Sequence, residues 1–286
     1  MKVLLPVFLC VLFLHAKAQP LQVDLYVGAA NYQGDLKTKR LSFKESKPAV
    51  GLGISYGLTN KLNIRGAANY MKVSGRDPQN ENAKNVAFRN LSFRSSVLEA
   101  QLALEYNILD IEERGFTPYV FGGVAVFHFN PYSYDSADNK VFLRSLGTEG
   151  QGLSQYPEKK LYSNNQFAIP FGGGIKLALT DKLQVGLELG LRKLFTDYLD
   201  DVSGTYADST ILASARGAQA AALSFRGKEI SGGATYPAEG FQRGNAKNKD
   251  WYFTTGLKIS YTLGRGTEGK GVRGRKGKLG CPANVY

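Results

Sequence analysis

The stretch NQFAIPFGGGIKLALTDKLQVGLELGLRKLF, residues 165–195, decides the fold. Each half alternates between apolar residues and polar or small ones, and a polar turn at Thr180 and Asp181 separates the halves. Successive side chains of a strand point to opposite faces, so this period of two predicts a β-hairpin with one aliphatic face. A soluble sheet turns that face inward, whereas a lipid-embedded barrel turns it outward. The aliphatic face comprises Phe167, Ile169, Phe171, Ile175, Leu177, Leu179, Leu183, Val185, Leu187, Leu189 and Leu191.

The same alternation recurs along the chain. Besides the two halves of the hairpin, it is found in residues 22–33, 49–57, 62–71, 96–107, 116–130 and 251–263. Long connections follow the first, third, fifth and seventh stretches, and short turns follow the second, fourth and sixth. An even number of antiparallel strands with all long loops on one side is typical of outer-membrane barrels. In the fifth stretch the alternation is less clear, and we expect the aromatic residues Tyr119, Phe121, Phe127 and Phe129 to face outward rather than Val120, Val124 and Val126.

The face opposite the aliphatic one distinguishes a membrane barrel from a soluble barrel. It carries too many charges for a hydrophobic core, but inside a barrel such charges can pair. The sequence therefore predicts an all-β fold, an eight-stranded antiparallel up-and-down transmembrane β-barrel spanning residues 19–263. Eight strands enclose an interior that side chains fill, so we expect no solute channel. The charged residues of this face are Arg65, Glu99, Glu105, Lys176, Glu188, Arg192 and Lys258.

Two further features concern the barrel ends. Aromatic residues at strand ends fit the interfacial girdles of membrane barrels. An alanine-rich segment at residues 210–223 has the spacing of a short helix, which we expect to lie over the external mouth. The expected girdle residues are Tyr70, Tyr106, Phe127, Phe129, Phe195, Trp251 and Tyr252.

The two termini differ from the barrel. Residues 1–18 have a charged start, an apolar core and an A-x-A cleavage pattern, which predicts an export signal peptide; the apolar run continues past Cys10, which disfavours lipidation there. Residues 264–286 contain six Lys or Arg and one Glu, which predicts a flexible basic periplasmic tail, with both termini in the periplasm. The tail either stays solvated or binds a periplasmic partner or peptidoglycan, and Cys281 is a spectator or forms an intermolecular disulfide. The net charge of +12, combined with export, favours lipid or cell-wall polymer over nucleic acid as the partner.

Candidate chemical groups are few. His128, with Ser133, Asp135 and Ser136 nearby in sequence, could form the catalytic group of a barrel lipase, but no nucleophile motif surrounds it. No zinc pattern is present, and residues 172–174 are better explained by close packing than as a phosphate cradle.

An acidic group follows the hairpin. Asp197, Asp200, Asp201 and Asp208 could bind a hard cation, but they lack a calcium-loop spacing, and capping of backbone amides explains them better. We predict no enzyme activity and no catalytic, cofactor-binding or metal site.

Five segments of the chain carry a family resemblance: NYQGDL (31–36), PYVFGGVAVFHFN (118–130), FGGGI (171–175), LRKLFTDYLDDVSGTY (191–206) and GNAKNKDWYF (244–253). They resemble an outer-membrane β-barrel family of Bacteroidota that includes PorG of the type IX secretion machinery. The resemblance implies a non-enzymatic barrel of the outer membrane that associates with periplasmic secretion-ring proteins, including a lipoprotein. We therefore expect a structural barrel that anchors a periplasmic assembly; the alternative is an external adhesin or ligand-binding barrel that acts through its long loops.

Overall fold

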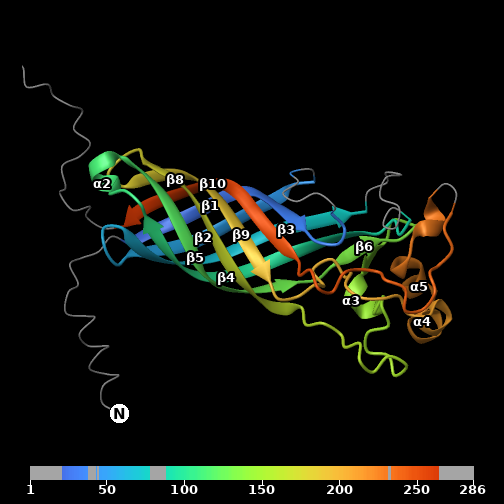
Figure 1. The fold of residues 1–286 in the computed structure, drawn as a ribbon. Helices are drawn as coiled ribbons and strands as arrows, with labels where there is room; N and C mark the ends of the chain where they lie inside the picture. Colours follow the sequence, from blue (N-terminus) through green and yellow to red (C-terminus); the bar gives the residue numbers. More distant parts are fainter. Residues whose placement is uncertain (1–20, 38–42, 44, 78–87, 231–232, 264–286) are drawn as a thin grey trace, which may run out of the picture.

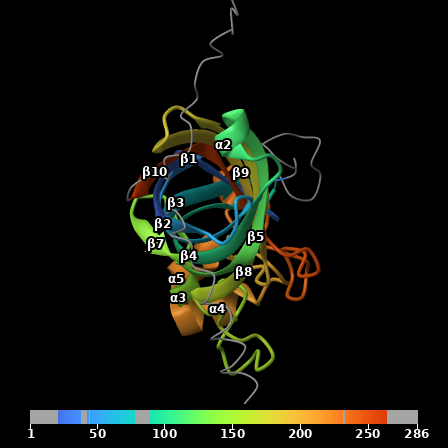
Figure 2. The ribbon, with the colours of Figure 1, turned by 90° about the vertical axis from the view of Figure 1, so that its left-hand side faces the viewer.

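Eight long strands form a closed barrel. The computed structural model describes residues 21–37, 43, 45–77, 88–230 and 233–263. Each strand pairs antiparallel with its neighbours, and the ring closes because β1 pairs with β10 from Leu21 opposite Leu263 to Gln33 opposite Trp251 (Figures 1 and 2). The predicted eight-stranded antiparallel barrel is therefore confirmed. Its strands are β1 (Leu21–Gln33), β2 (Lys47–Gly57), β3 (Leu62–Arg76), β4 (Ser92–Asn107), β5 (Phe116–Phe129), β8 (Asn165–Ala178), β9 (Leu183–Leu194) and β10 (Trp251–Leu263).

The two ends of the barrel differ, as the loop lengths predict. At the turn end lie the short connections 58–61, 108–115 and 179–182, and Leu21 and Leu263 begin and end the described chain there. The middle connection contains the short helix α2 (Ile111–Arg114). The predicted signal peptide and basic tail lie outside the described residues.

The opposite end, the loop end, carries an ordered layer of chain. We call residues 130–164 and 195–250, as far as they are described, the loop layer (Figure 1). The single helix predicted over residues 210–223 is two helices, because Gly217 breaks it with a φ of 89°. The elements of this layer are the hairpin β6 (Tyr132–Tyr134) and β7 (Lys140–Phe142), the helices α3 (Leu143–Leu146), α4 (Ser209–Arg216) and α5 (Ala218–Ser224), and the 3-10 turn η1 (Gly227–Glu229).

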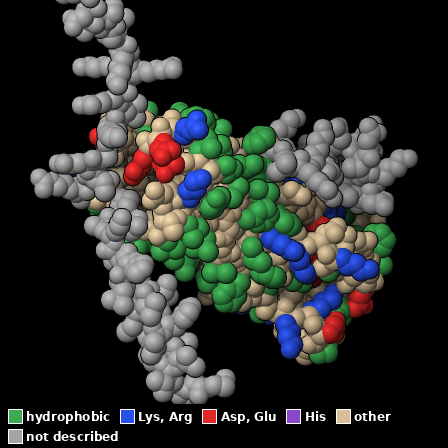
Figure 3. Space-filling model, turned by 60° about the vertical axis from the view of Figure 1, so that its left-hand side comes forward, with side chains coloured by type: hydrophobic (Ala, Val, Ile, Leu, Met, Phe, Trp, Pro, Cys, Tyr) green, Lys and Arg blue, Asp and Glu red, His purple; other side chains and the backbone are tan. Residues whose placement is uncertain are grey.

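The outer face of the wall is apolar, as Figure 3 shows for one side of the molecule. Every wall strand contributes large apolar side chains to it, and the inward positions between them hold most of the buried polar residues. A wall with this distribution can be surrounded by lipid, since its backbone groups pair within the ring and its outer side chains need no water. Exposed side chains of the wall include Val23, Leu25, Val27, Leu52, Ile54, Leu98, Leu102, Leu104, Val120, Val124, Phe167, Ile175, Leu187 and Leu257.

The prediction for the fifth strand was wrong. In β5 the valines face outward, and the four aromatic residues face the barrel interior, where each is at most 5% exposed. Phe127 and Phe129 join an aromatic core near the loop end that the loop layer covers: Phe127 contacts Phe129 and Tyr252, and Phe129 stacks on Tyr162. Phe127, Phe129 and Tyr252 are therefore not girdle residues, whereas Tyr70, Tyr106 and Phe195 are exposed as predicted.

Two strands are longer than predicted. β3 continues to Arg76 rather than residue 71, and β4 begins at Ser92 rather than 96. Beyond the apolar band the outward residues of these strands become polar, which hides the alternation in the sequence. The inward residues Val73 and Phe93 stay buried because the loop-end core covers them.

Candidate functional site: the charged barrel interior

Glu105 of β4 is the centre of the interior. Its carboxylate accepts hydrogen bonds from Arg65 of β3 at 3.2 Å, Lys258 of β10 at 3.1 Å and Asn63 at 3.2 Å. Lys176 of β8 also donates to it. Glu105 is fully buried and the three cations are at most 5% exposed. Since the cations come from three different strands, one carboxylate ties distant parts of the wall together.

Arg65 links this centre to a second carboxylate. Its guanidinium donates to both oxygens of Glu188, at 2.6 and 3.1 Å, in the bidentate geometry that makes such pairs strong. The hydroxyl of Tyr119 donates to the same carboxylate at 2.9 Å. The guanidinium carbon also lies 3.8 Å from the centre of the Phe121 ring. Arg65 is thus held by charge on one side and by an aromatic face on the other.

A second cluster lies closer to the loop end. Glu99 accepts from Arg192 at 3.1 and 3.2 Å, from Asn69 at 2.8 Å and from the Tyr252 hydroxyl at 2.5 Å. Arg192 also donates to the Thr254 hydroxyl at 2.7 Å. All five residues are buried, so the polar groups replace lost water with one another.

Asp24 of β1 completes the interior charges. It accepts hydrogen bonds from the hydroxyls of Ser55 and Ser260, and Lys258 lies 3.4 Å away. Lys258 therefore bridges Asp24 and Glu105, which stand on well separated strands. The pairing predicted for the seven interior charges is confirmed for all of them.

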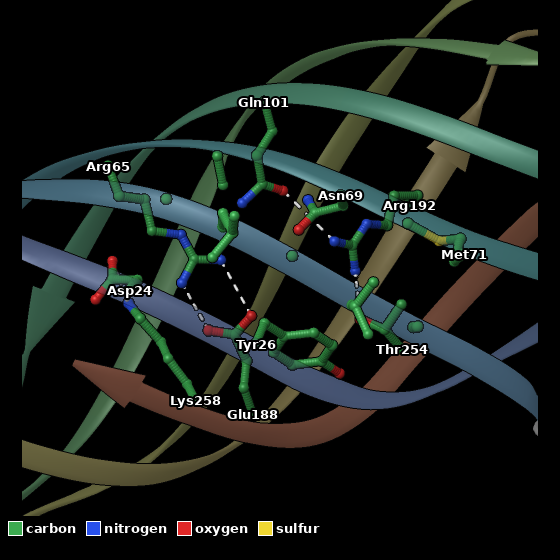
Figure 4. A pocket seen from close by; sticks show the side chains of 16 residues that line it. Asp24, Tyr26, Arg65, Asn69, Met71, Gln101, Glu188, Arg192, Thr254 and Lys258 are labelled. Atoms are coloured by element: carbon green, nitrogen blue, oxygen red, sulfur yellow. Dashed lines mark hydrogen bonds and ion pairs between the residues drawn. The ribbon is translucent and has the colours of Figure 1, made fainter.

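A small cavity remains between these clusters, next to β1, β2 and β3 (Figure 4). Its volume of about 30 Å³ is room for about two water molecules. Tyr26 Oη and Arg65 Nε belong to residues that line it, and neither atom has a hydrogen-bond partner among the described residues. We therefore expect ordered water there. A cavity of this size is a hydration site rather than a passage for solutes.

Glycines of the neighbouring strand β8 make room for aromatic rings that β5 sends into the interior. A methyl group on Gly172 would lie 3.0 Å from the Phe121 ring, and one on Gly174 would lie 2.9 Å from the Tyr119 ring. Close packing is thus the reason for these glycines, as the sequence predicts, and no helix begins after them.

The structure does not bring the residues around His128 together. His128 is on the outer face of β5, where its Nδ1 lies 2.8 Å from Asn165 Oδ1. Ser133 is buried beside Ser92, and Asp135 accepts backbone hydrogen bonds within the β6–β7 turn. The catalytic alternative for His128 therefore has no geometric support.

The four aspartates after the hairpin are also separated in their contacts. Asp200 accepts from the Val202 amide at 2.9 Å and Asp208 from the Thr210 amide at 2.8 Å, which agrees with the predicted capping role. Asp201 accepts from Thr148 and Tyr162, at 2.6 and 2.7 Å. Within the described ranges no three His, Cys, Asp or Glu side chains are grouped so that they could hold a metal ion.

Sequence reasoning missed a buried ion pair in the loop layer. Arg243 donates to Glu149 at 3.0 Å and to the backbone carbonyl of Asp201, and both Arg243 and Glu149 are at most 2% exposed. Glu149 also accepts from the amides of Ser203 and Gly204, at 2.9 and 3.1 Å. Loop segments have no periodicity, so nothing in the sequence marked this pair.

The fold and the inverted distribution of side chains, apolar outside and charged inside, define a β-barrel of the outer-membrane type. A family model described as a domain of unknown function, DUF6089, matches residues 1–216, and the chain belongs to that family. No curated protein matches the sequence. No helix in the described part of the chain is both long and apolar enough to cross a membrane.

Solved outer-membrane proteins are similar in outline. The attachment invasion locus protein Ail of Yersinia pestis is 7% identical, with 86% of this chain and 99% of that chain covered and a TM-score of 0.41. Neisserial surface protein A is 8% identical, with 86% and 97% covered and a TM-score of 0.39. A major outer membrane protein of Thermus thermophilus is 11% identical, with 85% and 99% covered and a TM-score of 0.42. At such low scores the fold assignment rests on the strand pairing itself.

Replacing the central carboxylate should destabilise the barrel strongly. In Glu105→Gln, three buried cations lose their shared anion, and removing one partner of a buried pair typically costs about 3–5 kcal/mol. We expect a loss of about that size in the free energy of unfolding, measured by urea titration in micelles with the fluorescence of Trp251, the only tryptophan. The exposed control Glu113→Gln should change it by less than about 0.5 kcal/mol. Adding Lys176→Gln to Glu105→Gln should restore part of the loss. Equal stability of the Glu105→Gln and Glu113→Gln variants would contradict the central role of Glu105.

The loop layer should loosen as pH rises because of Asp197. Burial raises the pKa of this carboxyl to about 7, and neither oxygen has a hydrogen-bond partner among the described residues. A carboxyl with a raised folded-state pKa favours the protonated folded state, so its contribution to stability falls between the unfolded value of about 4 and about 7. Asp197→Asn should weaken this pH dependence and protect the loop layer from proteolysis at pH 8, measured by limited digestion from pH 4 to 8. An unchanged pH profile would refute this assignment.

Proposed function

We propose that this chain is a structural barrel of the outer membrane that anchors a periplasmic assembly, as a PorG-like component of the type IX secretion machinery. The observation that carries the anchoring role is the filled interior: Glu105, Glu188 and Glu99 join strands across the lumen, and the cavity left between their clusters has room for about two waters. Because a filled barrel offers no passage to solutes, we expect its function to depend on contacts that its two ends make with other molecules.

The turn end supports contact with the periplasm. In outer-membrane barrels the short turns are periplasmic and the long loops external. Leu21 and Leu263 lie at the turn end, so the basic segment 264–286 leaves the barrel there, and both termini belong to the periplasm in this orientation. The partners we propose are outer-membrane lipid around the wall and periplasmic secretion-ring proteins, including a lipoprotein, at the turn end. The resemblance to the family that includes PorG supports this choice of partner, and a role in catalysis is not part of the proposal.

The anchoring role predicts that the basic segment is needed for assembly. Crosslinking and purification from outer membranes of the native organism should recover periplasmic partners with the full chain and lose them when residues 264–286 are deleted. Cys281→Ser should retain them if charge makes the contact, and lose them if an intermolecular disulfide does. The mobility shift between heated and unheated samples in gel electrophoresis should show that every variant is folded. Unchanged recovery of the same partners after deletion would refute the proposal.

An external adhesin or ligand-binding barrel is the second candidate, and the loop layer favours it. This layer is packed on a core that it shares with the barrel wall, to which it contributes buried Leu199, Leu212 and Leu223, and it also holds the buried pair of Arg243 and Glu149. Loops with a packed core can present a fixed surface. Here the exposed Phe241→Ser should abolish binding of cells or matrix while leaving secretion intact, measured with whole cells that display the barrel. Normal binding with this variant would count against contact through that surface.

A further inference from the structure

A group of cations lies on the outer face of the wall, directly beyond the apolar band at the loop end. Tyr70 of β3 and Leu98 of β4 are opposite each other and exposed, and they form the last apolar row of this part of the wall. The next outward position on β3 is Lys72, about 7 Å further along the strand, and Arg94 of β4 lies one row beyond it. Both cations are exposed. The outer face of the wall thus changes within two rows from apolar to positively charged.

The hairpin β6–β7 extends this surface across the sheet, from β4 to β6 and β7. Arg94 pairs with Tyr132 of β6, which pairs with Phe142 of β7, so three residues form one row across three strands. Lys140 Nζ lies 4.1 Å from the centre of the Tyr132 ring and 4.7 Å from that of Phe142, and the Arg94 guanidinium carbon lies 5.1 Å from the centre of the Tyr134 ring. The rings hold the cationic groups in place without neutralising them.

The charges of this surface are available to a partner. In the part of the chain that the structure describes, neither Lys72, Arg94 nor Lys140 forms an ion pair. The neighbouring Arg76 has a loose contact of 3.7 Å with Glu45, and its side chain is 61% exposed. We call Lys72, Arg76, Arg94 and Lys140, with Tyr132, Tyr134 and Phe142, the cationic collar.

The collar occupies one side of the barrel. On β5 and β8, the outward residues in the row of Leu98 are His128 and Asn165, which are hydrogen-bonded to each other. The collar spans four strands, or about 15 Å at the usual spacing between strands. Such a surface is the size of a lipid headgroup rather than of a whole protein interface, which is usually about 800 Å² per partner.

We propose that the cationic collar binds the phosphate groups of a phosphorylated glycolipid of the outer leaflet. This inference uses the orientation with the long loops outside and is otherwise independent of the anchoring role. The acyl chains of such a lipid lie against the apolar band below Tyr70 and Leu98, which places its phosphates at the height of Lys72 and Arg94. Arginine and lysine are the usual partners of phosphate oxygens, and aromatic rings are favoured at the boundary between lipid and water.

The proposal is tested with the full chain in dodecyl maltoside micelles, with bis-phosphorylated lipid A as the probe and native mass spectrometry to count bound lipid. Because cations attract anionic headgroups, the triple variant Lys72→Gln, Arg94→Gln, Lys140→Gln should bind lipid A at least about tenfold more weakly. A matched variant with Lys193, Lys247 and Lys249 changed to Gln removes the same charge from the other side of the barrel, and it should bind like the wild type. Both variants should keep the heat-dependent mobility shift of the folded barrel.

Two further probes separate the sources of binding. Lipid A without phosphates should bind at least about tenfold more weakly than the phosphorylated form, and inorganic phosphate at the same concentration should not displace it. The proposal is overturned if the dephosphorylated lipid binds equally well, since acyl chains would then account for the contact. It is also overturned if inorganic phosphate displaces the lipid, or if the triple and control variants lose affinity equally.

Discussion

The exclusion of polar groups from the outer face of the wall is the constraint on which this structure depends. In contact with lipid, every backbone group must pair within the sheet, and charged side chains have only the interior available to them. The interior in turn is too dry for an unpaired ion, so each charge needs a partner. Glu105 meets this need for three cations at once. The ion pairs therefore follow from the apolar exterior, and they also fix which strands face each other across the lumen.

The interior is divided along the barrel axis. Towards the turn end and the middle it is ionic, with Lys176, Lys258 and Arg65 around Glu105. Towards the loop end it becomes aromatic, where Phe129 stacks on Tyr162 of the loop layer. An aromatic end needs a cover, because uncovered rings would expose apolar surface to water, whereas water can solvate the charged groups of an ionic end. This explains why the long connections are packed into an ordered layer and why turns of a few residues are sufficient at the other end.

The period of two was sufficient to predict the barrel and the pairing of its interior charges, since both depend only on which side of a strand a residue occupies. It failed where another rule competes. In β5, valines and aromatic residues are both apolar, so hydrophobicity alone could not decide that Phe127 faces a covered aromatic core while Val126 faces lipid. In β3 the pattern stopped at residue 71, because the outward residue Lys72 lies beyond the apolar band while the strand continues to Arg76. The pair of Arg243 and Glu149 depends on loop geometry, which has no repeat to read.

The filled lumen also limits what a ligand could do to this protein. Ion pairs that join β3, β4, β8, β9 and β10 resist changes in the cross-section of the barrel, since any widening must separate buried opposite charges. Binding at the loop end is therefore poorly placed to open a passage. A rigid cylinder of this kind suits attachment better than signalling across the membrane. The cationic collar is consistent with this view, because a lipid bound at the rim adds to the hold of the barrel on its membrane and requires no movement of the wall.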